Sequence, residues 1–230
     1  PVEGIEVRNL GTVFGVEFTN QLLRRRNRVL KRAVDLVLGL GGCLVTLPVV
    51  LASALAIKLS SRGPAFFSQQ RVGVGGRAIT IWKLRTMAPN AQRLLAEHLA
   101  TDPAAREEWE RSFKLSRDPR VSGRVGRFLR RFSLDELPQL WSVVLGDMSL
   151  VGPRPFPDYH LAQLPPAFCD LRAQVRPGIT GLWQVMVRSE GGLAEQQRFD
   201  TYYIRNWSLW MDLYLLARTG AAVLRGRGAY

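Results

Sequence analysis

The sequence predicts a mainly helical α+β protein that one helical segment attaches to a membrane. Three observations predict this fold class: residues 36–57 carry no charged side chain, residues 65–87 alternate around a glycine-rich turn, and the stretch from about 195 to 224 has the pattern of helices. The chain has 230 residues, of which 47% are hydrophobic and 22% are charged. This composition is typical of a folded protein with one or two domains.

The N-terminal residues 2–18 alternate enough to form strands, with Gly4, Gly11 and Gly15 as turn points. The chain starts at Pro1 rather than at a methionine, so we expect a fragment of a longer protein or a processed chain. Residues 1–23 are accordingly predicted to be the remnant of a preceding N-terminal domain or linker.

Residues 36–57, LVLGLGGCLVTLPVVLASALAI, form the candidate membrane segment. A helix of about 20 apolar residues is long enough to cross a bilayer. The basic run RRRNRVLKR precedes the segment, and Lys58 and Arg62 follow it. Because cationic flanks favour the cytoplasmic side, both ends of the segment are expected there.

Pro48 lies near the middle of this segment and removes one helical hydrogen bond. Together with the flanks, it favours a re-entrant helix–break–helix over residues 24–62, in which the hydroxyl of Thr46 or Ser53 bonds a freed carbonyl. A kinked transmembrane helix fits the same residues, because such helices tolerate proline.

Residues 65–87, AFFSQQRVGVGGRAITIWKLRTM, predict a β-hairpin with its turn at 73–76. The glycines do not form a phosphate-binding loop, because no lysine and serine or threonine follow them. The other predicted elements follow from local signals in the same way. They are an exposed helix or helix pair at 90–115 broken near 101–103, a short helix at 139–147 ending near Gly146, a proline-fixed loop at 151–157, and a turn into a strand at 175–185.

The charge of the chain is strongly positive, with 32 Lys and Arg against 19 Asp and Glu, a net charge of +13. This excess indicates a polyanionic partner: nucleic acid, an anionic membrane surface or phosphorylated substrates. Cys43 and Cys169 stand far apart, so the sequence indicates neither a disulfide framework nor a zinc site.

The stretch SLDELPQLW at 133–141 places Asp135 and Glu136 side by side, shortly before Pro138. Ser133 and Glu136 fit a capping box, whereas Pro138 favours Asp135 as the N-cap. On either interpretation both carboxylates lie in the first helical turn, where the helix dipole favours the ionised form. An ionised aspartate is an available nucleophile, although many acidic residues in a first turn only cap the helix.

Basic residues near this pair favour a role in chemistry at phosphorus. Phosphoryl transfer needs cations on the non-bridging oxygens, and the candidates are Lys83, Arg85, Arg130 and Arg154. The prolines around Arg154 stiffen its backbone. A carboxylate pair beside phosphates also suggests Mg²⁺, a hard cation that prefers oxygen ligands.

These motifs resemble those of the bacterial sugar transferases, the monotopic polyprenyl-phosphate phosphoglycosyl transferases. The matching blocks are the apolar segment with Pro48, then GPAFFSQQRVGVGG, WKLRTM, RDPRVSGRVGRFLRRFSLDELPQLWSVVLGDMSLVGPRP and RPGITGLWQV, over roughly residues 28–224. The C-terminal sequence is most similar to the undecaprenyl-phosphate galactose phosphotransferases. One departure is the sequence TLP at residues 46–48, because the family often has a serine before this proline.

The resemblance implies a reaction in which a sugar 1-phosphate, galactose 1-phosphate first, moves from a UDP-sugar to undecaprenyl phosphate with release of UMP. It implies Asp135 as the nucleophile that forms a covalent phosphosugar intermediate, with Glu136 as a metal ligand or in handling the acceptor's proton. Both carboxylates are then expected at Mg²⁺. Lys83, Arg130 and Arg154 would hold phosphates, and Arg85 is a further candidate for phosphate binding. Arg176 and Thr180 are candidates for binding the nucleotide of the substrate or for supporting the C-terminal architecture.

The resemblance also implies an organisation. Residues 24–62 would be the re-entrant membrane helix, residues 63–194 a small cytoplasmic catalytic domain, and residues 195–230 a C-terminal interfacial helical segment. The protein would lie at the cytoplasmic face of a bacterial inner membrane, in contact with membrane lipid and without nucleic acid. It would catalyse the first membrane step of O-antigen, capsule or exopolysaccharide synthesis, and a homodimer is compatible with the resemblance.

Three alternatives compete with this interpretation. The same chemistry with UDP-glucose or a UDP-N-acetylhexosamine fits the residues equally, because donor specificity is not readable from them. A basic, membrane-anchored nucleic-acid-binding protein would give no role to Asp135 and would bind DNA or RNA with a steep salt dependence. In a membrane scaffold, the acidic pair would only cap a helix.

Overall fold

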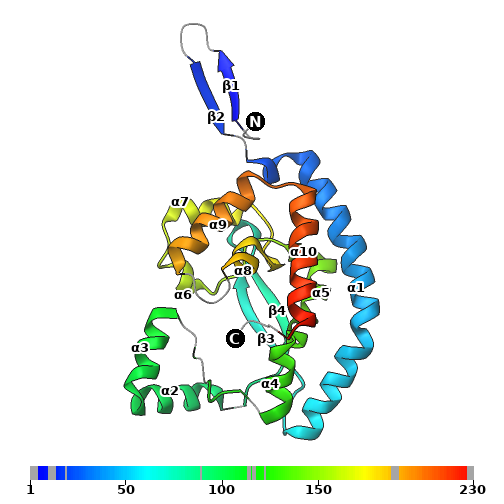
Figure 1. Ribbon diagram of the computed structural model, residues 1–230, viewed down its shortest axis with the longest axis vertical. Helices are drawn as coiled ribbons and strands as arrows, with labels where there is room; N and C mark the ends of the chain where they lie inside the picture. Colours follow the sequence, from blue (N-terminus) through cyan, green and yellow to red (C-terminus); the bar gives the residue numbers. More distant parts are fainter. Residues whose placement is uncertain are drawn as a thin grey trace.

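A computed structural model describes residues 5–9, 14–18, 20–88, 90–112, 115, 118–121, 123–187 and 192–226. Figure 1 shows a mainly helical body with a long helix along one side and short pairs of strands. The elements are β1 (Ile5–Asn9), β2 (Phe14–Phe18), η1 (Gln21–Leu23), α1 (Arg25–Ser60), β3 (Phe66–Val72), η2 (Val74–Gly76), β4 (Ala78–Leu84), α2 (Ala91–Thr101), α3 (Pro103–Ser112), α4 (Gly123–Arg131), η3 (Leu134–Glu136), α5 (Gln139–Leu145), β5 (Ser149–Val151), α6 (Asp158–Leu161), α7 (Pro166–Ala173), β6 (Gly178–Thr180), α8 (Leu182–Met186), α9 (Leu193–Arg205) and α10 (Leu209–Leu224). The predicted mainly helical α+β class is confirmed.

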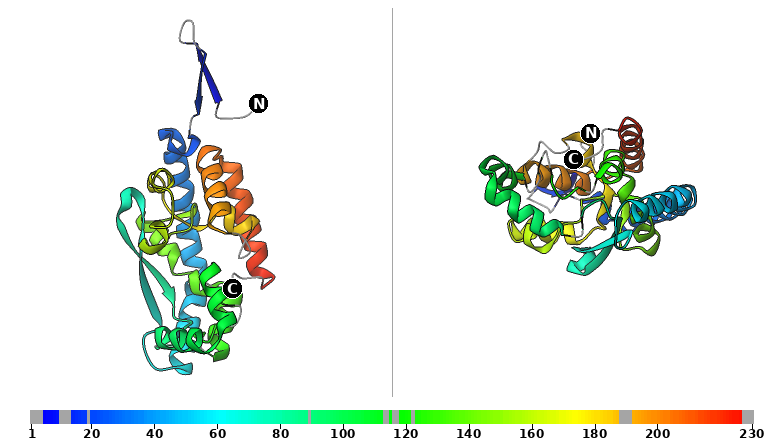
Figure 2. Two further views of the ribbon diagram at one scale, coloured as in Figure 1. Left: turned by 90° about the vertical axis from the view of Figure 1, so that its left-hand side faces the viewer. Right: turned by 90° about the horizontal axis from the view of Figure 1, so that it is seen from below.

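The two N-terminal strands pair antiparallel and project from one end of the molecule (Figure 2). The prediction of strands in residues 2–18 is therefore confirmed for β1 and β2. Gly15 lies within β2, opposite Arg8, rather than in a turn. Gly4 and Gly11 lie outside the described residues.

The candidate membrane segment belongs to α1, which runs without interruption through Pro48. The predicted helix–break–helix is therefore not present as two helices. Instead, Figure 1 shows one helix that bends along its length. A bend of this kind accommodates the loss of the backbone hydrogen bond that proline cannot donate. The Thr46 hydroxyl donates to the Gly42 carbonyl over 2.7 Å, which is its own preceding turn and not a carbonyl freed by proline. The re-entrant path stays a prediction.

One face of α1 is apolar and open. Among the described residues, α1 is the one helix long and apolar enough to cross a membrane, and only 6% of its most apolar window is buried inside the protein. Leu44 and Val45 are 74% and 77% exposed. On the opposite face Gly39 and Gly42 let α5 approach, since a Cβ on either would lie 3.3 Å from Val143 or Leu140. An exposed apolar surface of this length is what a lipid environment would cover.

The predicted hairpin of β3 and β4 is confirmed, with antiparallel register from Phe66 opposite Leu84 to Val72 opposite Ala78. Its turn holds Gly75 and Gly76 at φ of 67° and 75°, a conformation that glycine adopts without strain. Ile79 and Ile81 of β4 are buried in the main core. The core also takes side chains from α5, β5, α9 and α10, among them Val143, Met148, Leu150, Val151, Tyr203, Ile204 and Leu215.

β5 and β6 form a parallel pair, with Ser149 opposite Gly178 and Val151 opposite Thr180. The pairing brings two glycines together, because a Cβ on Gly178 would lie 2.1 Å from the backbone nitrogen of Gly152. The backbones of the motifs GPRP and RPGITG therefore lie in direct contact. This arrangement confirms the loop predicted after 151 and the strand predicted within 175–185.

A buried polar cluster ties α1 to the C-terminal helices. Lys31 Nζ lies 2.6 Å from Asp212 Oδ2, and the same carboxylate accepts hydrogen bonds from the Tyr203 hydroxyl and the Trp207 indole nitrogen. Asp35 accepts a bond from the backbone nitrogen of Leu150. The cluster thus fixes the start of α1 against β5, α9 and α10.

The remaining predicted helices are also confirmed. α2 and α3 lie within the region predicted at 90–115 and separate at Asp102, α5 ends at Gly146 with φ of 97°, and α9 and α10 lie in the C-terminal stretch. The proposed domain boundaries stay a prediction.

Candidate active site

The acidic pair lies on η3, a single turn between α4 and α5. Ser133 precedes it with φ of 53° and is the one non-glycine with positive φ among the described residues. Neither capping interpretation is correct: the side chain of Ser133 makes no capping hydrogen bond, and α5 starts after Pro138, beyond both carboxylates. A strained residue two positions before Asp135 instead sets the direction of the turn, as strained backbone often does at functional sites.

Glu136 is held by cations from two other elements. Its Oε1 lies 2.6 Å from Lys83 Nζ of β4 and 3.5 Å from Arg154 Nη2 in the loop after β5. Lys83 reaches it because side chains alternate along a strand, so that Ile79, Ile81 and Lys83 share the face of β4 that meets the protein interior. The structure therefore brings together Lys83, Arg154 and Glu136, as the sequence predicts.

Asp135 is placed differently. Apart from its own backbone amide, its carboxylate has no hydrogen-bond or ion-pair partner among the described residues. Glu136 and the cations Lys83 and Arg130 act on it electrostatically. Asp135 is thus the carboxylate of the pair that is available to an incoming group.

The two carboxyl groups have opposite pKa shifts. Burial first, and then the charge of Glu136, raise the pKa of Asp135 to about 6, against the opposing effect of Lys83 and Arg130. Burial also acts on Glu136, but the charges of Lys83 and Arg154 and hydrogen bonds from Lys83 and Gln139 outweigh it, so the pKa of Glu136 is lowered. Such a divided pair suits one group for a fixed charge and the other for chemistry near neutral pH.

Arg154 is held in place by its neighbours. The guanidinium of Arg172 donates to the backbone carbonyl of Arg154, packs over the Phe156 ring at 4.0 Å and pairs with Asp200 at 3.6 Å. The loop predicted to be stiff is therefore supported from below by a buried arginine. The Arg154 side chain itself is 36% exposed and reaches the acidic pair.

The other predicted site residues lie elsewhere. Arg85 donates to the Ser61 and Arg62 carbonyls and to the Ser61 hydroxyl at the end of α1. Arg176 donates through Nε to the Gly146 carbonyl at 2.8 Å, and the Thr180 hydroxyl is 2.8 Å from that of Thr219. These bonds hold elements together, and a role of these residues in substrate binding stays a prediction.

Two residues with a clear part in the site were missed. Gln139 is 3% exposed, and its side chain makes a hydrogen bond to Glu136. Arg172 holds the loop of Arg154 through a hydrogen bond to the Arg154 carbonyl. Gln139 is within the motif SLDELPQ, so its position was a signal. Arg172 gave none, because its partners are distant in sequence.

The donor set fits Mg²⁺ in a limited way. The described residues contain no group of three or more metal-ligating side chains, so a fully protein-held ion is not built here. Mg²⁺ is commonly held by one or two carboxylates, substrate phosphates and water. Asp135 and Glu136 supply that number of carboxylates.

The fold and the site together define a protein with a long apolar helix beside a carboxylate pair and converging cations, the groups that chemistry at phosphate uses. Over residues 26–226 the chain matches the bacterial sugar transferase family, and it belongs to that family.

Three curated relatives illustrate the similarity. An undecaprenyl-phosphate galactose phosphotransferase of Salmonella typhimurium is 44% identical over 92% of this chain and 44% of its own length. A UDP-glucose:undecaprenyl-phosphate glucose-1-phosphate transferase of Escherichia coli is 40% identical over 89% of this chain and 42% of its own length. The exopolysaccharide production protein ExoY of Sinorhizobium fredii is 38% identical over 97% of this chain and 98% of its own length. The chain thus spans less than half of the first two relatives and nearly all of the third.

Proposed function

We propose that the protein transfers a sugar 1-phosphate from a UDP-sugar to undecaprenyl phosphate and releases UMP. The observation that carries the proposal is the division of the acidic pair: Glu136 is neutralised by Lys83 and Arg154, while the Asp135 carboxylate has no such partner among the described residues. Family membership and the names of the relatives support the same class of reaction.

In the first step, a carboxylate oxygen of Asp135 attacks the sugar-linked β-phosphorus of the donor. The new bond joins this oxygen to phosphorus, and the bond from the β-phosphorus to the oxygen bridging to the α-phosphate breaks. That oxygen leaves with the electron pair as part of UMP. A phosphosugar–aspartyl intermediate remains.

In the second step, a phosphate oxygen of undecaprenyl phosphate attacks the same phosphorus. The bond to Asp135 breaks, the carboxylate is regenerated, and the product is a lipid-linked diphosphate sugar. Lys83 and Arg154 orient the phosphate groups and stabilise charge on their non-bridging oxygens. Arg130 contributes positive potential beside Asp135.

Mg²⁺, when bound, would supply further charge neutralisation on the phosphate oxygens. Asp135 and Glu136 are the residues that would hold it.

α1 supports a location of this chemistry at a membrane. Its exposed apolar face would insert among lipid, and the basic residues at both ends would remain on the cytoplasmic side. The lipid phosphate acceptor lies at the headgroup level of the same membrane. The re-entrant path and the cytoplasmic face of the inner membrane belong to this proposal.

The donor sugar is proposed to be galactose, because a relative at 44% identity carries that name. Relatives at 40% and 38% identity are named for glucose and for N-acetylgalactosamine, so these donors are the alternatives. The test is UMP release by purified protein in lipid, with Mg²⁺ and undecaprenyl phosphate, across a panel of UDP-sugars. Release that requires both the lipid phosphate and Asp135 supports the proposal, and release that persists with Asp135→Asn contradicts it.

A further inference from the structure

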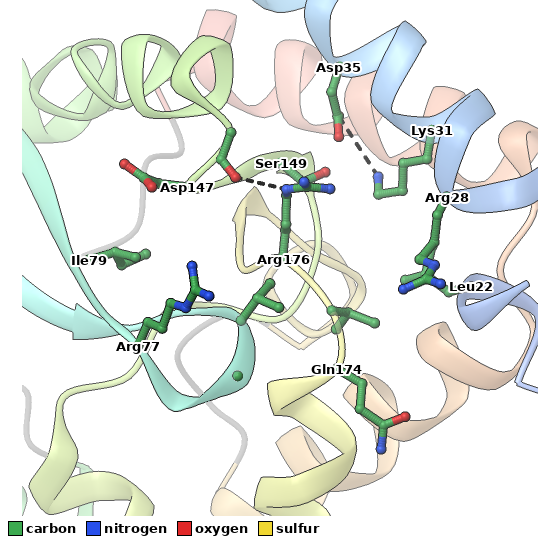
Figure 3. Close-up of a pocket in the computed structure, with 14 residues that line it drawn as sticks. Leu22, Arg28, Lys31, Asp35, Arg77, Ile79, Asp147, Ser149, Gln174 and Arg176 are labelled. Carbon is green, nitrogen blue, oxygen red and sulfur yellow. Dashed lines mark hydrogen bonds and ion pairs between the residues drawn. The ribbon is translucent and has the colours of Figure 1, made fainter. Parts of the chain in front are cut away.

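A cationic cavity lies away from the acidic pair. It has a volume of about 380 Å³ and is open to solvent between the start of α1, the turn of the β3–β4 hairpin and the loop before β6 (Figure 3). Arg28 enters from α1, Arg77 from the hairpin turn and Arg176 from the loop. Three guanidinium groups from three separate segments therefore surround one space.

This cavity is distinct from the proposed active site. Arg77 precedes β4 and Lys83 lies near its other end. At about 3.3 Å per residue, six residues of extended chain separate the two Cα atoms by about 20 Å. None of Lys83, Asp135, Glu136 and Arg154 lines the cavity.

The cations of the cavity are poorly neutralised. Within the described part of the chain, the guanidinium groups of Arg28 and Arg77 make no ion pair or hydrogen bond. The guanidinium of Arg176 makes one hydrogen bond there, to the carbonyl of Gly146. Lys31 also lines the cavity, but Asp212 and Asp35 already pair with it. Burial first, and then the charges of Arg32 and Arg28, lower the pKa of Arg176, with Asp35 opposing them. The cavity is also lined by the carboxylates of Asp35 and Asp147, so four cations face two carboxylates and positive charge is in excess.

We propose that this cavity binds a phosphate-bearing anion at a site separate from the one where sugar phosphate is transferred. Guanidinium groups bind phosphate oxygens through paired, charge-assisted hydrogen bonds, which makes arginine the side chain best suited to such a ligand. A cavity of this volume falls in the range of small-molecule sites and holds more than a bare phosphate. Its apolar wall, from Leu22, Val74, Ile79 and Val175, fits an organic substituent on the phosphate.

Two sources could supply the phosphate group. The cavity lies beside Arg28 and Lys31, just before the apolar part of α1, and Arg25, Arg32 and Arg176 line an adjoining open hollow. A basic pocket next to a membrane segment suits the headgroup of an anionic phospholipid. A soluble phosphate or diphosphate compound has the same recognition chemistry.

The test is native mass spectrometry of the detergent-solubilised protein with three probes: phosphatidylglycerol, zwitterionic phosphatidylcholine and inorganic pyrophosphate. The variants are Arg28→Ala and Arg77→Ala, whose side chains are exposed, so that neither is expected to disturb folding. Arg93→Ala is the matched control, because it removes an exposed arginine on α2 that is only paired with Glu97. Lys83→Met, which removes a cation of the acidic-pair site, tests whether the anion sits at the proposed active site.

We expect saturable binding of phosphatidylglycerol or pyrophosphate that weakens about tenfold or more in each cavity variant and is unchanged in Arg93→Ala and Lys83→Met. Phosphatidylglycerol alone identifies a lipid headgroup as the ligand, and pyrophosphate identifies a soluble one. The proposal is overturned if neither probe binds, if the cavity variants bind as well as the wild type, or if Lys83→Met removes the binding. Because the readout is binding, it does not depend on whether the proposed transfer reaction occurs.

Discussion

Lys83 Nζ lies 2.6 Å from Glu136 Oε1, and this contact joins the β3–β4 hairpin to the turn that carries the acidic pair. The lysine neutralises one carboxylate and also lowers the pKa of the other, since its charge acts on Asp135. Because both side chains are about three-quarters buried, salt and water screen the attraction between their charges less than in a surface salt bridge. The hairpin thus controls which carboxylate of the pair is free for chemistry.

The first prediction concerns Asp135. Asp135→Asn removes the anionic nucleophile, and we expect UMP release to fall by at least about 1,000-fold. The same change is expected to stabilise the fold at pH 7. The pKa of Asp135 in the folded protein, about 6, lies above the usual 3.8, so ionisation of this carboxyl destabilises the fold. This destabilisation is absent below about pH 4 and complete above about pH 6.

Thermal unfolding at pH 7 and pH 4 checks this prediction beside the activity assay. We expect Asn at this position to raise the apparent Tm at pH 7 and to leave it nearly unchanged at pH 4. Cys169→Ser is the control for activity, because among the described residues the thiol of Cys169 has hydrogen-bond contacts only with the Leu161 and Leu164 carbonyls. Full turnover with Asn at 135 would rule out the covalent mechanism.

The second prediction is the pH dependence of turnover. Because Asp135 must be ionised to attack, we expect the rate to fall about tenfold per pH unit below its pKa of about 6. Glu136, whose pKa is lowered, stays ionised across the same range. Initial rates of UMP release between pH 5 and pH 8 at saturating donor test this, and a flat profile down to pH 5 is the contrary result.

The third prediction removes the lysine. Lys83→Met keeps the length of the side chain without its charge, so the pKa of Asp135 should rise and the acid limb of the pH profile should move to higher pH. Loss of a charge-assisted contact to phosphate should also lower the rate about 10-fold or more. An unshifted acid limb would show that Lys83 does not act on Asp135.

Local sequence signals were sufficient to predict the β3–β4 hairpin and the helix α5 and to single out the acidic pair as a candidate site. Glycines at 73–76 between strand-like runs define the turn, and Gly146 ends α5 in the left-handed conformation. The conformation of the acidic turn was not predictable, because Ser133 adopts a positive φ that a capping pattern argues against. At a functional site such strain is held by the surrounding fold, which local patterns do not encode.

Long-range relationships were also beyond the sequence patterns. The hydrogen bonds of Arg85 to the end of α1 join residues that are distant in the sequence, and its role in phosphate binding stays a prediction. The parallel pairing of β5 with β6 depends on the close approach of Gly152 and Gly178, which are far apart in the chain. Such contacts arise from tertiary packing and leave no periodic signal.

The fourth prediction concerns Arg154. Arg154→Ala removes a cation that reaches Glu136 at 3.5 Å, and we expect a rate loss of about 10- to 100-fold with an unchanged apparent Tm. The side chain is 36% exposed, so its contribution to stability should be small. Arg172→Ala is the matched comparison, since it should lower both the rate and the Tm through loss of its buried contacts with Phe156 and Asp200.

The last prediction is structural and concerns the cluster that holds the start of α1. Asp212 is 2% exposed and receives Lys31 at 2.6 Å, together with bonds from Tyr203 and Trp207. Asp212→Asn keeps the size of the side chain but leaves the buried Lys31 without its nearest counter-charge, because Asp35 lies at 3.9 Å. Breaking a buried pair in this way costs about 3–5 kcal/mol.

We therefore expect a clear fall in apparent Tm for Asp212→Asn, measured by thermal unfolding in detergent. Glu97→Gln breaks an ion pair with Arg93 whose side chains are 71% and 62% exposed, and it should leave the Tm unchanged. Because the two substitutions both replace a carboxylate by its amide, a difference between them isolates the effect of burial. Equal Tm values for both variants would mean that Lys31 finds another partner and that the cluster does not anchor α1.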